Sequence, residues 1–191
     1  MCTAVTFTAK DFYFGRTLDD TISRNEEVVI TPRNYLFAFQ HMGEMHNHYA
    51  IIGMACVEKT EDCVDGSRPE RENRWEIVRH NSGGKEPSSA GREYPLYYEA
   101  VNEKGLAMAG LNFVGNAFYQ DFEEVMAGRE YVAQFELIPW ILGQCATVEE
   151  ARRRLERLTV TGEAFAPGLL PAQLHWLLAD KNEAVTIEAV Q

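Results

Sequence analysis

A long polar segment divides the apolar residues of the chain into two blocks. Between residues 57 and 93 the sequence is dominated by Glu, Arg, Asn, Ser and Gly, and its apolar residues form one small island at Trp75, Ile77 and Val78. Such a segment lacks the apolar surface that would offset the entropy lost on ordering. We therefore interpret residues 57–93 as a polar insertion, of a composition that permits disorder, within one domain that spans residues 1–191.

Outside this segment the composition is typical of a globular domain. The chain has 191 residues, of which 46% are hydrophobic and 25% charged, and its formal net charge is −11. This acidic balance argues against a partner such as nucleic acid or an anionic membrane. The longest dense apolar run, residues 137–142, is too short to cross a bilayer, and no secretory signal is visible at the N-terminus. We therefore expect a cytoplasmic protein.

The hydrophobic patterns predict strands on both sides of the insertion. Apolar residues alternate with polar ones near the N-terminus, and a continuous apolar run precedes the insertion, which favours a strand covered on both faces. After the insertion, a turn at 102–105 separates two further strands, and a hairpin turning at 180–182 closes the chain. The predicted strands are 5–7, 12–14, 28–30, 49–56, 96–98, 106–112, 173–179 and 184–189.

Two helices are expected between the later strands. Residues 133–145 are apolar and predict a helix that is kinked or restarted near Pro139. Thr147 with Glu150 three residues later forms a capping box, which begins a helix whose apolar stripe runs from Val148 to Leu158. Strands, then helices, then strands indicate the α+β class with antiparallel sheets.

The cysteines and histidines do not predict a metal site. Cys2, Cys56, Cys63 and Cys145 show no paired spacing, which argues against a disulfide framework and against structural zinc. His41, His46 and His48 lie close in sequence, but no carboxylate or cysteine completes the set at a convincing spacing. We therefore expect no metal, and we interpret Cys56 and Cys145, which lie in apolar runs, as inert core thiols.

Cys2 is the residue with the clearest chemical potential. It becomes the first residue once Met1 is removed, so that one residue then carries both a thiol nucleophile and an α-amine base. Such a site needs a nearby cation to favour the thiolate, an acceptor to orient the ammonium, and donors to stabilise an oxyanion. The three requirements direct attention to polar residues elsewhere in the chain.

Several motifs in this chain resemble the choloylglycine hydrolase family, which includes conjugated bile salt hydrolases and penicillin V acylases. They are Met1-Cys2-Thr3, Phe14-Gly15-Arg16-x-x-Asp19, Asn102-Glu103-Lys104-Gly105-Leu106, Ala109-Gly110-Leu111-Asn112-Phe113 and Gln173-Leu174-His175-Trp176. The resemblance covers nearly the whole chain except the insertion. It implies an αββα sandwich of the N-terminal-nucleophile hydrolase type, built from antiparallel sheets and helices.

The resemblance also implies a role for each matching residue. Cys2 is the implied nucleophile, Arg16 lies beside its sulfur, Asp19 holds the α-amine, Asn112 helps form the oxyanion hole, and Leu18 lines an apolar substrate pocket. The implied reaction is hydrolysis of a small-molecule amide, without a cofactor, through an acyl-thioester. Asn112 favours conjugated bile salts over the penicillin V acylase alternative, and the family resemblance is compatible with a homo-oligomer.

The chain departs from the family pattern in two places. One is the insertion, and the other is the end of the chain, because family members continue well beyond the strand at 184–189 with a second oxyanion asparagine and a further arginine. We therefore expect a fold that is incomplete at the C-terminus, with an open strand edge. Two hypotheses remain: an active amide hydrolase, or an inactive N-terminal fragment of one.

Overall fold

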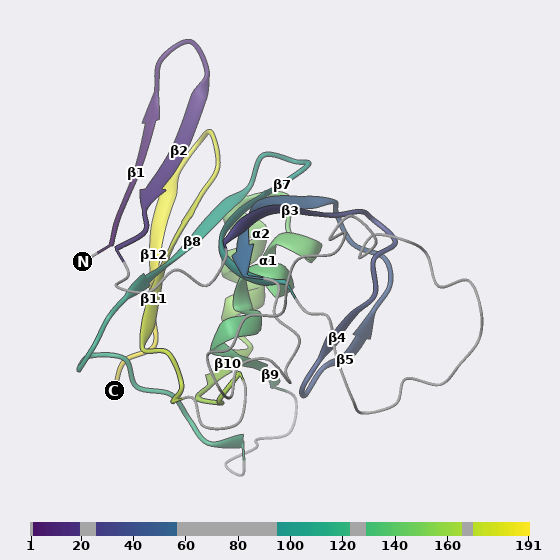
Figure 1. Cartoon of the computed structure of the whole chain (residues 1–191), viewed down its shortest axis with the longest axis vertical. Coiled ribbons are helices and arrows are strands. Elements are labelled where there is room, and N and C mark those ends of the chain that lie inside the picture. The colour runs from purple at the N-terminus through teal and green to yellow at the C-terminus, as the bar shows by residue number, and fades with distance from the viewer. Residues whose placement is uncertain (1, 20–25, 57–94, 123–128, 166–169) are drawn as a thin grey trace, which may run out of the picture.

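A six-stranded antiparallel sheet forms the centre of the molecule (Figure 1). The computed structural model describes residues 2–19, 26–56, 95–122, 129–165 and 170–191. The predicted polar insertion lies outside these residues, so its disorder and the single-domain organisation stay predictions. The strand order is β12 (Ala184–Glu188), β11 (Leu174–Ala179), β8 (Ala107–Asn112), β7 (Leu96–Asn102), β6 (Ile51–Cys56) and β3 (Glu27–Thr31).

These strands confirm the α+β prediction and most of the predicted strand positions. The central strand β8 is buried along its length up to Leu111, as expected of a strand with neighbours on both sides and little side-chain bulk. Strand β3 forms one edge of the sheet, and Pro32 follows it directly, where the loss of a backbone donor costs no ladder hydrogen bond.

The prediction that the apolar run 49–56 is covered on both faces was wrong. In β6 the side chain of Ile51 is buried, whereas Ile52 is 42% exposed. Ile52 pairs with Ile30 of β3, which is also exposed. The run is apolar on both faces, but only the face that contacts the helix is covered along this part of the sheet.

Helix α1 (Leu137–Gln144) covers that face of the sheet, packing on β6, β7 and β8. It is apolar around its whole circumference and is buried up to Gly143, as such helices usually are. The predicted helix 133–145 therefore exists but begins later: Ala133 ends strand β9, and a 3₁₀ turn, η3 (Gln134–Glu136), leads into α1. Pro139 lies in the first turn of α1, where its missing N–H breaks no helical hydrogen bond.

Helix α2 (Val148–Leu155) begins at the predicted cap. The Thr147 hydroxyl accepts a hydrogen bond from the backbone N–H of Glu150 at 3.2 Å, and the Glu150 carboxylate accepts one from the backbone of Ala146 at 2.7 Å. The capping box thus forms with its return bond one residue earlier than the usual pattern. Leu158, predicted as part of the helical stripe, belongs instead to strand β10.

Two pairs of short strands were not predicted. Three or four residues are too few to show a period of two, and neither pair has a two-residue hairpin turn. The pairing of β9 with β10 is parallel, an exception to the antiparallel prediction. The four strands are β4 (Phe37–Phe39), β5 (Gly43–Met45), β9 (Glu130–Ala133) and β10 (Leu158–Thr161).

The predicted turn after β7 is tied to the end of α1 by the buried side chain of Asn102. Its amide donates hydrogen bonds to the carbonyl oxygens of Leu142 and Cys145, at 2.8 and 2.7 Å. Its carbonyl oxygen accepts bonds from the backbone N–H groups of Lys104 and Leu106, at 3.0 and 3.1 Å. The side chain therefore satisfies two carbonyls left open at the end of a helix and shapes the turn at the same time.

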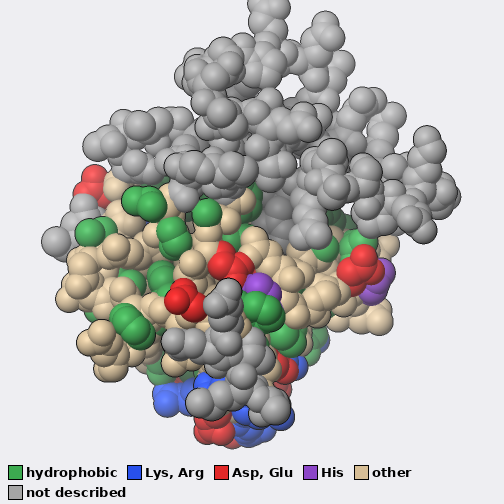
Figure 2. Space-filling view, turned by 90° about the horizontal axis from the view of Figure 1, so that it is seen from below, with side chains coloured by type: hydrophobic (Ala, Val, Ile, Leu, Met, Phe, Trp, Pro, Cys, Tyr) green, Lys and Arg blue, Asp and Glu red, His purple; other side chains and the backbone are tan. Residues whose placement is uncertain are grey.

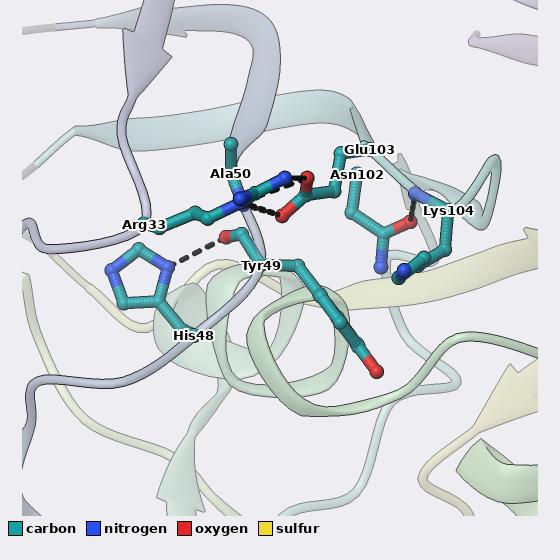
Figure 3. Close-up of polar contacts among 7 residues, drawn as sticks. All are labelled: Arg33, His48, Tyr49, Ala50, Asn102, Glu103 and Lys104. Atoms are coloured by element: carbon teal, nitrogen blue, oxygen red, sulfur yellow. Dashed lines mark hydrogen bonds and ion pairs between the residues drawn. The ribbon is translucent and has the colours of Figure 1, made fainter.

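Glu103 fastens the same turn to the segment before β6 (Figure 3). Its carboxylate accepts hydrogen bonds from the Arg33 guanidinium and, at 3.0 Å, from the backbone N–H of Ala50. The Arg33 hydrogen bond, followed by that of Ala50, lowers the pKa of Glu103 to about 2. The turn is thus joined to the segment before β6, and Figure 3 shows the side chains of Arg33 and Glu103 pointing toward each other.

The surface carries basic and acidic side chains together, despite the negative net charge. Figure 2 shows Lys and Arg side chains gathered at one rim of the face seen from below, next to Asp and Glu. On α2, each of Arg152, Arg153 and Arg154 forms an ion pair with a glutamate. Within the described residues, no helix has both the length and the apolar character needed to cross a bilayer.

Candidate active site

The hairpin of β1 (Thr3–Thr8) and β2 (Phe12–Thr17) brings Cys2 and Arg16 to the same face. Ala4 pairs with Arg16 across the hairpin, and Cys2 shares the face of Ala4 because side chains alternate along a strand. A hydrogen bond of 3.1 Å from the backbone N–H of Thr3 to the Thr17 hydroxyl holds the beginning of the hairpin together. The two predicted residues are therefore diagonal neighbours, a separation that long side chains can bridge.

The guanidinium of Arg16 connects this hairpin to the central sheet. Its Nη2 donates a hydrogen bond to the carbonyl oxygen of Gly110 on β8 at 2.8 Å, and its Nη1 lies 3.3 Å from a carboxylate oxygen of Glu99 on β7. The Arg16 side chain is only 3% exposed. A buried charge of this kind requires a partner, and Glu99 supplies it.

A pocket of about 360 Å³ lies where the hairpin meets the sheet, and all the predicted site residues line it. Arg16 lies on β2 and Asn112 on β8, Cys2 directly precedes β1, and Leu18 and Asp19 are the two residues after β2. The structure therefore brings together residues that lie far apart in the sequence. Their chemical roles remain predictions.

The remaining walls of the pocket are mainly apolar. They come from β6, β7, β8, β11, η3, α1 and the segment after β10, so both the sheet and the helical layer contribute. These lining residues are Cys56, Leu96, Tyr97, Tyr98, Gly110, Gln134, Phe135, Ile138, Phe165, Leu170, Ala172, Leu174 and Trp176.

Sequence reasoning missed Glu99, which contacts the pocket residue Arg16, and it missed that Cys56 and Trp176 line the pocket. Glu99 had a detectable sign, a carboxylate in an otherwise apolar strand, but its partner Arg16 is distant in sequence. Cys56 was interpreted only as a core thiol; it is 2% exposed, as expected, and it also lines the pocket. Trp176 is fully buried, and it lies against Gly110, with which it is paired across β11 and β8.

Burial changes the titration of two groups in this region. Burial raises the pKa of the Glu99 carboxyl above its ordinary value, and the nearby charge of Arg16 opposes this rise. Burial also raises the pKa of the Tyr97 hydroxyl, which lies 3.3 Å from the hydroxyl of Thr31. In both groups, desolvation outweighs the interactions that favour the charged form.

The three histidines considered for a metal are used in other ways. His48 is buried, with its ring nitrogens 2.6 and 2.8 Å from the carbonyl oxygens of Tyr49 and Tyr35. His41 contacts Glu163, and His46 contacts Glu44. In the part of the chain that the structure describes, no three His, Cys, Asp or Glu side chains come together as metal ligands would.

Solved structures define the class of this fold. The chain superposes with a TM-score of 0.75 on the C2A variant of the conjugated bile acid hydrolase from Clostridium perfringens, at 22% identity, covering 100% of this chain and 49% of that one. It also matches the penicillin V acylase from Agrobacterium tumefaciens, with a TM-score of 0.54, 15% identity, and coverage of 88% and 39%. The fold is thus the α+β fold of N-terminal-nucleophile hydrolases, as the resemblance implied.

The sequence identifies the family within that class. Residues 2–67 and 88–191 match the linear amide C–N hydrolases of the choloylglycine hydrolase family. The chain belongs to this family, which confirms the resemblance stated above.

Relatives of known function share this sequence over its length. The bile salt hydrolase/transferase of Lactiplantibacillus plantarum is 39% identical over 191 residues, which is 100% of this chain and 48% of that protein. The conjugated bile acid hydrolase of Lactobacillus gasseri is 30% identical over 190 residues, 98% of this chain and 49% of that protein. The chain spans about half the length of the curated relatives it matches.

Proposed function

We propose that this chain carries the nucleophile site of a hydrolase that cleaves conjugated bile salts or related N-acyl amides. The observation that supports the proposal is the single pocket lined by Cys2, Arg16, Asp19 and Asn112. Family membership and relatives named as bile salt or bile acid hydrolases support the same substrate class. The proposed substrate is a small-molecule amide, and the proposed reaction needs no cofactor.

In the proposed mechanism, removal of Met1 frees the α-amine of Cys2. The sulfur attacks the amide carbonyl, and the amide side chain of Asn112 donates to the resulting oxyanion. The carbon–nitrogen bond then breaks, and the α-amine passes the thiol proton to the leaving amine. Water attacks the thioester, which releases the carboxylic acid and restores the thiol.

Arg16 and Asp19 prepare the nucleophile in this mechanism. The buried guanidinium of Arg16 places positive charge at the pocket wall, which favours the thiolate form of a nearby cysteine. Asp19 follows β2 and lines the same pocket, and its carboxylate orients the ammonium form of the α-amine. Both roles are assigned to side chains that line the pocket.

The apolar part of the pocket suits the acyl side of the substrate. Leu18, Phe135, Ile138 and Phe165 line it, and a volume of about 360 Å³ lies within the range of small-molecule sites. A steroid acid or another bulky apolar acid can bury its ring surface there. The polar amine fragment then lies on the side of Cys2 and Asn112.

The test is amine release by the purified full chain, after mass spectrometry has shown that Met1 is absent. We expect glycine or taurine to be released from a conjugated bile salt, and Cys2→Ser to abolish this release. Cys63→Ser, which makes the same chemical change outside the described residues, is the matched control and should keep the activity. Penicillin V as substrate tests the acylase alternative.

The outcome also decides between the two hypotheses for this chain. Absence of amine release from both substrates, by protein that is folded and lacks Met1, supports an inactive chain. Release that persists in Cys2→Ser contradicts the proposed nucleophile.

A further inference from the structure

Arg16 has more hydrogen-bonding capacity than the described residues use. One of its nitrogens, Nη2, is bonded to the Gly110 carbonyl, whereas Nε and Nη1 are buried without a hydrogen-bond partner among those residues. A single hydrogen bond does not by itself set the plane of a guanidinium. A second contact is needed to fix its plane, and Glu99 is the group in position to provide it.

The sheet places Glu99 beside the residue that Arg16 already contacts. Glu99 on β7 pairs with Ala109 on β8, and Ala109 directly precedes Gly110. Arg16 therefore reaches across two adjacent strands and contacts a carbonyl on one and a carboxylate on the other. These two contacts, 2.8 Å to Gly110 and 3.3 Å to Glu99, define its position relative to the strands.

The partly buried position of Glu99 is unfavourable for the stability of the sheet. Its side chain is 28% exposed, its Oε2 atom is buried, and that oxygen has no hydrogen bond within the described part of the chain. A buried ion pair is often no more stable than apolar residues of the same volume. The carboxylate is therefore better explained by the placement of Arg16 than by stability.

We propose that Glu99 is a positioning residue for the Cys2 site: it anchors the Arg16 guanidinium beside Cys2 and balances its charge. The inference rests on the proposed function, in which Cys2 is the nucleophile. Glu99 acts through Arg16 and not on the substrate. Its removal has two separable effects, because loss of the negative charge favours the thiolate and loss of the anchor lets Arg16 move away.

Two substitutions separate the charge from the anchor. Glu99→Gln removes the charge but keeps an oxygen that can accept from Arg16, whereas Glu99→Ala removes both. The readout is the rate of Cys2 alkylation by iodoacetamide as a function of pH, followed at the Cys2 peptide by mass spectrometry on the full chain without Met1. The other titratable groups that line the pocket are Asp19, Cys56, Tyr97 and Tyr98.

We expect the two variants to shift the profile in opposite directions. In Glu99→Gln the pH at half-maximal rate falls by about one unit, because a nearby negative charge has been removed. In Glu99→Ala it rises, and the rate at pH 7 falls by about tenfold, because the cation is no longer held near the sulfur. In an Arg16→Met background, Glu99→Ala should no longer lower the rate at pH 7, since the anchoring effect of Glu99 acts through Arg16.

Two results would overturn the inference. One is a shift of equal size and direction in Glu99→Gln and Glu99→Ala. The other is a fall in the alkylation rate on Glu99→Ala that persists in the Arg16→Met background, because such a fall would indicate a general loss of structure. Amine release is measured on the same samples. If the alkylation profiles shift as expected but no amine is released, the role of Glu99 is supported and the proposed hydrolysis fails. If amine is released but the two variants have the same profile, the proposed hydrolysis is supported and the role of Glu99 fails.

Discussion

The turn at Asn102 and the pocket at Arg16 both bury polar side chains, but they differ in how many of the buried polar groups have hydrogen-bond partners. Asn102 makes hydrogen bonds with both its amide and its carbonyl oxygen. At the pocket, Arg16 Nε, Trp176 Nε1 and an oxygen of Glu99 are buried without hydrogen-bond partners among the described residues. A satisfied network gives rigidity, whereas unsatisfied buried groups cost stability and usually have a functional reason.

This difference separates two kinds of motif in the sequence. The Asn102-Glu103-Lys104-Gly105 motif, one of the marks of family resemblance, has a structural task in the described residues: it joins β7, β8, α1 and the segment before β6. The residues that line the pocket contribute to a cavity instead. Family motifs therefore do not all indicate chemistry.

Replacement of Asn102 should have the largest effect on stability. Asn102→Ala leaves without partners two buried carbonyls, the buried N–H of Leu106 and the partly buried N–H of Lys104, and we expect a loss of about 3–5 kcal/mol in the free energy of unfolding. Urea denaturation followed by circular dichroism measures this loss. Asn116→Ala, at an exposed position, is the control and should change the free energy by less than about 0.5 kcal/mol. A loss below about 1 kcal/mol at Asn102 would contradict the structural role of the turn.

Replacement of the pocket ion pair should change stability less than Asn102→Ala does, and it should abolish amine release. The double variant Arg16→Met with Glu99→Leu exchanges two partly satisfied charges for apolar side chains, and we expect a change within about 1 kcal/mol. Arg16→Met alone should cost more, because it leaves the Glu99 carboxylate without its partner. The same urea titration, together with an amine-release assay, measures both properties. A double variant that is much less stable than the single one would show that the pocket charges are structural.

The pH dependence of stability should separate Glu103 from its neutral replacement. Because the folded pKa of Glu103, about 2, is below its ordinary value, the ionised carboxylate stabilises the folded chain at neutral pH and loses this contribution as the pH falls from about 4.5 to 2. The difference in stability between wild type and Glu103→Gln should therefore shrink across this window. Arg33 is largely exposed, so added salt should weaken the effect. A difference that does not vary with pH would mean that the ion pair contributes little.

The smallest effect is expected for alkylation of Cys145, whose carbonyl is bonded by Asn102 in the turn region where the buried polar groups of Asn102 are satisfied. Burial raises the pKa of its thiol to about 11, so at pH 8 only about one molecule in a thousand carries the thiolate. Iodoacetamide should therefore leave Cys145 unmodified in the folded chain and modify it after unfolding in urea. Peptide mapping by mass spectrometry checks this. Modification of Cys145 as fast as that of Cys2 in the folded chain would remove the contrast between the two regions.

Local patterns were sufficient for elements whose information lies close in sequence. The Thr147 cap, the alternation in β1 and β2, and the turn at 180–182 each depend on neighbouring residues, and each was predicted. The parallel pair β9–β10 was not, because its two strands are separated by two helices and have no turn between them. Exposure of Ile52 was also missed, since an apolar run does not reveal which sheet face has a covering layer.

The site followed a similar rule. Cys2, Arg16, Asp19, Asn112 and Leu18 were identified through family resemblance, and the structure brings them to one pocket. Glu99 escaped detection because its significance depends on a contact with Arg16, and that contact exists only after the hairpin has docked on the sheet. Residues that act through a partner are invisible until the partner is placed.

The pairing of β1 with β2 has a consequence for how this hairpin can change in length. Cys2 and Arg16 share a face because of the register in which Ala4 opposes Arg16. One residue inserted within either strand would turn the thiol and the guanidinium to opposite sides, whereas two would restore their common side one step further along. Functional variants of these strands should therefore differ in length only by even numbers of residues, because only such changes keep the thiol on the same face as the guanidinium.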